Sequence, residues 1–202
     1  MKHKRISGSF LFAELWSAPA FILLSALFLC GAIAGCFTGR MVAGSGLSPV
    51  TDFAAMLEEN ARRTPGAKDA LLAALGAFGW QVAALLAGAV HPASLFLSLL
   101  AVVRGFVLSF SVTALVHALD TEGMWLSLAS GGACAVITVP CLLLTAAACF
   151  LAAQDAPRGR RGGYLYALSR HRGAVLLCTL AAMWAGVLQL PVAWMIERWF
   201  VG

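Results

Sequence analysis

The residue with the clearest chemical potential in this sequence is Arg104, which lies inside a long apolar run. It follows the His91-Pro92 pair by about ten residues, so at 1.5 Å per helical residue it lies roughly 15 Å into a membrane span, near the midplane. A cation at that depth costs about 2.5–3.5 kcal/mol on insertion scales and usually faces protein or water. The apolar runs offer no mid-span Asp or Glu as a partner.

Three counterparts for Arg104 follow from this: backbone carbonyls freed near Gly131-Gly132 or Pro140, a phospholipid, or a carboxylate on another subunit. The alternative is an arginine that snorkels to the membrane surface because the span begins elsewhere. In the first interpretation the residue contacts a partner or a ligand. In the second it only marks a span boundary.

The other reactive side chains form no catalytic or metal-binding pattern. The cysteines make no Cys-x-x-Cys pair, and small apolar filling explains them better than disulfide or metal chemistry. The four histidines are scattered at span ends, and the sequence has no His-Glu-x-x-His and no glycine-rich phosphate loop. We therefore expect no catalytic residue, no metal and no cofactor, and a protein that is not an enzyme.

Small residues recur at every fourth position in two of the apolar runs. Gly31, Gly35 and Gly39 do so in the first, and Gly105 begins a similar series with Ser109 and Thr113 in the third. Such faces allow helix backbones to approach closely inside a membrane. Packing of the chain's own helices is the favoured interpretation, and a face reserved for another protein is the alternative.

These residues belong to a chain with few segments suited to water. Hydrophobic residues make up 61% and charged residues 11% of it, and the mean hydropathy is +0.87. Since about 20 apolar residues cross a bilayer as a helix, we predict five spans. Their approximate ranges are 17–39, 69–90, 93–118, 132–153 and 173–196. The predicted fold is an all-α, polytopic membrane helix bundle in a single domain, 1–202.

The distribution of Lys and Arg predicts the orientation, because short basic loops stay in the cytoplasm. Basic residues collect before the first span and between the fourth and fifth, whereas the face that carries loop 40–68 is balanced. We expect a multi-pass protein of the cell membrane with a cytoplasmic N-terminus and an extracytoplasmic C-terminus. The net charge of +5 then meets anionic membrane lipid and requires no nucleic acid.

Loop 40–68 is the largest polar segment. Ser48-Pro49 is a typical helix start, and Phe53 and Leu57 then recur on one face with charged residues on the others. This pattern predicts a short outer amphipathic helix that could serve as a partner surface. A solvated connector between two spans is an equally good interpretation.

The order of these elements resembles the stage II sporulation protein M family. The resemblance rests on Arg104-Gly105 within the run Leu95 to Ala118, on Val139-Pro140, on the glycine pair Gly31 and Gly35, and on the outer loop. The family's Pro-x-Asn or Pro-His-Gly before the fourth span is replaced here by Ala133-Cys134-Ala135.

The resemblance implies a membrane scaffold that positions cell-wall hydrolases, of the stage II sporulation D and P type, at the septum during engulfment in spore formation. The rival hypothesis is a permease-like subunit of a transporter, in which Arg104 faces a substrate path or a partner helix. The polar residues of the spans make only a sparse lining for such a path. Neither hypothesis decides whether the chain forms a homo-oligomer.

Overall fold

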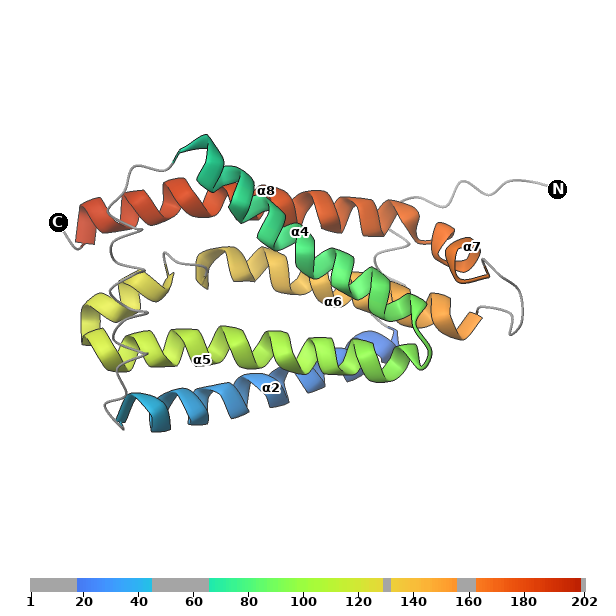
Figure 1. Ribbon diagram of the computed structural model, residues 1–202, viewed down its shortest axis with the longest axis horizontal. Coiled ribbons are helices and arrows are strands. Elements are labelled where there is room, and N and C mark those ends of the chain that lie inside the picture. Colours follow the sequence, from blue (N-terminus) through green and yellow to red (C-terminus); the bar gives the residue numbers. More distant parts are fainter. Residues whose placement is uncertain (1–17, 45–65, 129–131, 156–162, 201–202) are drawn as a thin grey trace.

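The computed structural model describes residues 18–44, 66–128, 132–155 and 163–200, and every element in them is a helix (Figure 1). The all-α class predicted from the sequence is confirmed. The elements are α2 (Pro19–Gly44), α4 (Ala67–Ala89), α5 (Ala93–Ser127), α6 (Ala133–Asp155), α7 (Gly163–Ser169) and α8 (Arg172–Phe200).

Five of these helices are long and apolar enough to cross a membrane, as predicted. The candidate spans are Pro19–Val42, Ala67–Ala89, Ala93–His117, Ala133–Asp155 and Arg172–Val192. Successive spans run in opposite directions along the bundle (Figure 1). We call the two ends of the bundle the His91 end, where α4 meets α5, and the Ala67 end, where α4 begins.

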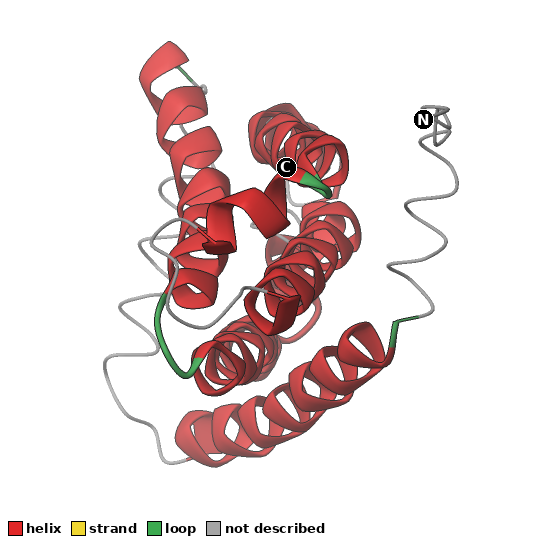
Figure 2. Cartoon of the chain, turned by 90° about the vertical axis from the view of Figure 1, so that its right-hand side faces the viewer, coloured by secondary structure: helices red, strands yellow, loops and turns green. Residues whose placement is uncertain are grey.

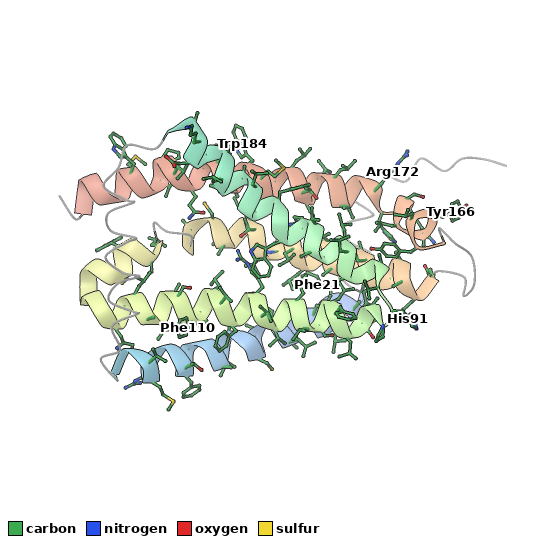
Figure 3. All side chains as sticks on the ribbon, in the orientation of Figure 1. Phe21, His91, Phe110, Tyr166, Arg172 and Trp184 are labelled. Carbon is green, nitrogen blue, oxygen red and sulfur yellow. The ribbon has the colours of Figure 1, made fainter. Side chains whose placement is uncertain are left out.

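The outer surface of the bundle is apolar. On α2, Leu29, Ile33 and Phe37 are 59%, 58% and 70% exposed and lie on one stripe of the helix. Trp184 of α8 likewise points away from the bundle (Figure 3). Exposed side chains of this kind are stable against lipid and costly in water, which identifies a multi-pass membrane protein.

Helix α6 is the centre of the bundle, as the view along the bundle from the His91 end shows (Figure 2). Its run from Leu142 to Cys149 is buried, and small side chains such as Ala147 let the neighbouring helices approach. The main core joins this run to the His91 half of α2, α4 and α5, including Leu24 and Leu97. The tightly packed half of the molecule is therefore the His91 half.

Helices α2 and α5 form a pair with very close backbones. A Cβ atom built on Gly31 or Gly35 would overlap the carbonyl oxygen of Val102 or Phe106, and one on Gly105 would overlap that of Phe28. At Gly39 the closest such contact is 3.0 Å. The two series of small residues noted in the sequence thus meet each other within the chain, with Phe110 beside them (Figure 3).

Helix α4 lies beside α5 at the His91 end, where α4 ends, whereas at the Ala67 end it lies apart from α5 and against α8 (Figure 1). A Cβ on Gly186 of α8 would lie 2.9 Å from the carbonyl oxygen of Ala73, so glycine is needed for this contact. Because α4 leans on α8 at the Ala67 end, space opens between α4 and α5 there.

The short helix α7 closes the His91 end. The Tyr164 hydroxyl donates a hydrogen bond of 3.1 Å to the carbonyl oxygen of Leu85 in α4. Gly88 makes room for this ring, since a Cβ there would lie 2.5 Å from the hydroxyl oxygen and 2.8 Å from the Cβ of Cys149. Burial, followed by the contact with the Cys149 thiol, raises the pKa of Tyr164 above its ordinary value of 10.

Two features of the structure were not predicted, and one prediction falls beyond the described residues. The predicted span 93–118 agrees with the candidate span Ala93–His117, but helix α5 itself continues to Ser127, because a helix keeps its backbone hydrogen bonds after it leaves the apolar layer. Helix α7 was not predicted. The expected outer amphipathic helix, with Phe53 and Leu57, lies outside the described residues.

Candidate functional site: the cavity beside Arg104

A cavity of about 300 Å³ lies where α4 separates from α5, in the Ala67 half of the bundle. Four helices contribute to its wall. The residues are Ala73, Gly76, Ala77 and Trp80 of α4; Arg104, Val107, Leu108, Ser111, Val112 and Ser127 of α5; Cys134 and Thr138 of α6, with Gly132 before it; and Gly186 and Gln189 of α8. Its volume is at the lower end of the range for small-molecule sites.

Arg104 lines the cavity from the middle of the candidate span Ala93–His117 of α5, and its guanidinium lies over the ring of Trp80 of α4. The guanidinium carbon lies 4.7 Å from the centre of the indole ring, which is a cation–π contact. The expected counterpart was a carbonyl, a lipid or a carboxylate. The contact that the described residues show is an aromatic ring, which attracts a cation without neutralising its charge. A lipid or a carboxylate on another subunit stays a prediction.

The contact with Trp80 supplies the guanidinium with no hydrogen-bond acceptor. The group carries five N–H donors in one plane. Among the described residues, no hydrogen bond or ion pair is made by Arg104. The residue therefore carries a charge and a planar set of donors into a cavity.

The C-terminal part of α5 returns toward the bundle and closes the cavity at the Ala67 end. A straight helix would place Ser127 about 35 Å from Arg104, yet both residues line the same small cavity. Figure 1 shows the cause, because the last turns of α5, drawn in yellow, turn back toward α6. The reversal is thus a change of direction within one helix.

The polar groups of the wall are uncharged apart from Arg104. Two serine hydroxyls donate to their own helix, Ser111 to the carbonyl oxygen of Val107 at 2.8 Å and Ser127 to that of Met124 at 2.9 Å. Each hydroxyl keeps lone pairs that can accept a further hydrogen bond. No carboxylate is among the described lining residues, so the cavity has a net positive charge.

The α4 wall is apolar and built from small residues. Gly76 lines the cavity, and a Cβ atom built on it meets no atom within 4 Å. The same is true of Gly79 one turn further on, but Gly79 does not line the cavity. Gly76 is therefore not needed for helix packing, and its lack of a side chain leaves the cavity open.

The structure separates the residues singled out from the sequence into two groups. Arg104 lines the cavity. Gly31, Gly35, Gly39 and Gly105 lie instead in the contact between α2 and α5, on another side of α5. Phe53 and Leu57 lie outside the described residues. Whether any of them meets another protein stays a prediction.

Sequence reasoning missed Trp80 and Gly76, whose roles depend on how α4 crosses the bundle. The one signal available was that two aromatic residues and two glycines, within residues 76–80, interrupt an alanine- and leucine-rich run in α4. Comparison with family models, curated proteins and solved structures finds no match to this chain. The resemblance to the stage II sporulation protein M family therefore stays a prediction.

Proposed function

We propose that this chain is a permease-like membrane subunit that receives the anionic group of a small ligand at Arg104. The observation that carries the proposal is a cation at mid-span that faces a cavity with no carboxylate among its described lining residues. A charge kept at this depth against its insertion cost is a functional candidate by default.

The surroundings of Arg104 suit an anion for a second reason. Outside bulk water an attraction between charges is only weakly screened, so a single guanidinium attracts an anion more strongly here than at a surface. The Thr138 hydroxyl and the Gln189 amide also line the cavity, and both kinds of group can donate a hydrogen bond to a bound anion. A polar wall built from several spans is also what a substrate path through a permease requires.

The scaffold function implied by the family resemblance is a proposal without a structural argument of its own. Its expected partner surface, residues 40–68, lies largely outside the described residues. The glycine faces, its other candidate surface, are occupied by the contact between α2 and α5. The cavity is therefore the feature that favours the permease-like subunit over the scaffold.

Charge-selective thiol labelling tests the proposal without a known ligand. In a variant whose native cysteines are replaced by alanine, Ser111→Cys places a thiol in the cavity wall. A negatively charged methanethiosulfonate reagent should label this thiol at least about five times faster than a positively charged one, because the field of Arg104 concentrates anions. Adding Arg104→Gln should remove the preference.

Two controls make the labelling result specific. Ser109→Cys lies on the same helix but does not line the cavity, so it should react slowly with both reagents. Arg170→Gln removes an exposed arginine in the turn after α7 and should leave the preference at Ser111→Cys unchanged. Equal labelling by the two reagents at Ser111→Cys, with Arg104 present, would refute an anion-accepting cavity.

A further inference from the structure

We infer that the ligand of this cavity is a small organic monocarboxylate, held by Arg104 through its carboxylate and by the α4 wall through its apolar body. The inference rests on the proposed function and specifies the ligand class. It depends on three features of the site: the planar donor set of the guanidinium, the number of cations and the division of the wall into two surfaces.

The shape of the guanidinium favours a planar anion. Among the described residues Arg104 makes no hydrogen bond or ion pair, and its contact with Trp80, at 4.7 Å, is a cation–π contact. The guanidinium presents pairs of parallel N–H donors, which match the two oxygens of a carboxylate in a bidentate contact. Trp80 also restrains the side chain, which lowers the entropy lost when the contact forms.

The number of cations favours a single negative charge. Arg104 is the only charged residue among the described lining residues. A phosphate monoester carries roughly 1.5 to 2 negative charges at neutral pH and would bring an uncompensated charge into the bundle. A monocarboxylate is neutralised by one guanidinium.

The two surfaces of the wall favour an organic ligand rather than an inorganic ion. Ala73, Gly76 and Ala77 form an apolar surface that offers nothing to the outer oxygens of an inorganic ion. It suits a short aliphatic or aromatic body, and the volume of about 300 Å³ keeps that body small. Gly76 lies in this surface with open space before it, so it should set the size limit.

Equilibrium binding to the full chain in phosphatidylcholine nanodiscs tests the inference, with radiolabelled benzoate and acetate as probes. Gly76→Leu should weaken benzoate binding at least about tenfold and acetate binding by less than about threefold, because the added side chain fills the space for the ring but does not reach Arg104. Gly79→Leu, its matched control, should change both by less than about twofold. Arg104→Gln should weaken both at least about tenfold.

A competition experiment, in which unlabelled anions displace bound radiolabelled benzoate, separates the failure of this inference from that of the proposed function. If phosphate or sulfate displaces benzoate more effectively than acetate does, while Arg104→Gln still abolishes binding, the carboxylate assignment is wrong and the anion site stands. If no anion binds in an Arg104-dependent manner, both are wrong. Laurate embedded in the nanodisc tests whether the carboxylate comes from the membrane. Displacement of benzoate by a small amount of laurate supports a fatty-acid ligand. Displacement of benzoate only by water-soluble acids supports a ligand from solution.

Discussion

Replacing Gly35 by alanine tests whether the close contact between α2 and α5 determines the stability of the bundle. A Cβ at this position would overlap the carbonyl oxygen of Phe106, which belongs to the backbone and cannot rotate away. The helices would have to separate by about 1 Å along a face on which their backbones now touch. We expect a cost near the upper end of overpacking effects, about 3 kcal/mol, of which the better helix propensity of alanine returns about 1 kcal/mol.

A graded series supplies the controls. In Gly39→Ala the new Cβ would lie 3.0 Å from the nearest oxygen, so a smaller loss follows. In Gly76→Ala the Cβ meets nothing within 4 Å, so the propensity gain of about 1 kcal/mol should appear as stabilisation. Gly35→Ala and Gly76→Ala should therefore differ by about 3 kcal/mol in the free energy of unfolding.

Reversible unfolding in mixed detergent micelles, driven by sodium dodecyl sulfate and followed by far-UV circular dichroism, measures these differences. The expected order of stability is Gly76→Ala, then wild type, then Gly39→Ala, then Gly35→Ala. Equal midpoints for Gly35→Ala and Gly76→Ala would show that the contact between α2 and α5 does not limit stability, and the argument from Cβ overlap would fail.

Two further predictions concern orientation and the His91 end. Reporter fusions after Gly66 and Gly202 should report the extracytoplasmic side, and a fusion after Gly162 should report the cytoplasmic side. The reason is that basic residues collect in the segments assigned to the cytoplasm. A cytoplasmic C-terminus would contradict this orientation. Tyr164→Phe should lower the free energy of unfolding by about 1 kcal/mol through loss of the hydrogen bond to Leu85. The pKa of Tyr164 is raised in the folded state, so the contribution of Tyr164 to the free energy of unfolding should be constant below pH 10 and decline above it. Unfolding titrations at several pH values should show this decline in the wild type and not in the phenylalanine variant.

The spans were predictable because hydropathy depends on local composition alone. The five apolar runs gave the number of membrane-spanning helices, and the depth of Arg104 followed from its distance to the turn at His91-Pro92. The small-residue spacing of Gly31 and Gly35 predicted close packing, although the helix they meet depends on tertiary structure. Hydropathy could not predict the end of α5, because it marks where a helix leaves the bilayer and not where its hydrogen bonds stop.

The site was only half predictable. A charged residue within an apolar run is visible in any sequence, so Arg104 could be found. Its stacking on Trp80 could not, because the crossing of α4 over the bundle is decided by the contact between Gly186 and Ala73 far along the chain. The small helix α7 was missed because seven residues are too few to show a periodic pattern.

The central position of α6 has a consequence for how the protein is made. Spans enter the bilayer in the order of synthesis, so α2, α4 and α5 are inserted before the helix around which they pack. The contact between α2 and α5 needs neither α6 nor α8, and it can form as soon as the third span is in place. The four-helix wall around Arg104, in contrast, is complete only when the last span arrives. A chain halted after α5 would thus already hold Arg104 and Trp80, but not the parts of the cavity wall that α6 and α8 supply.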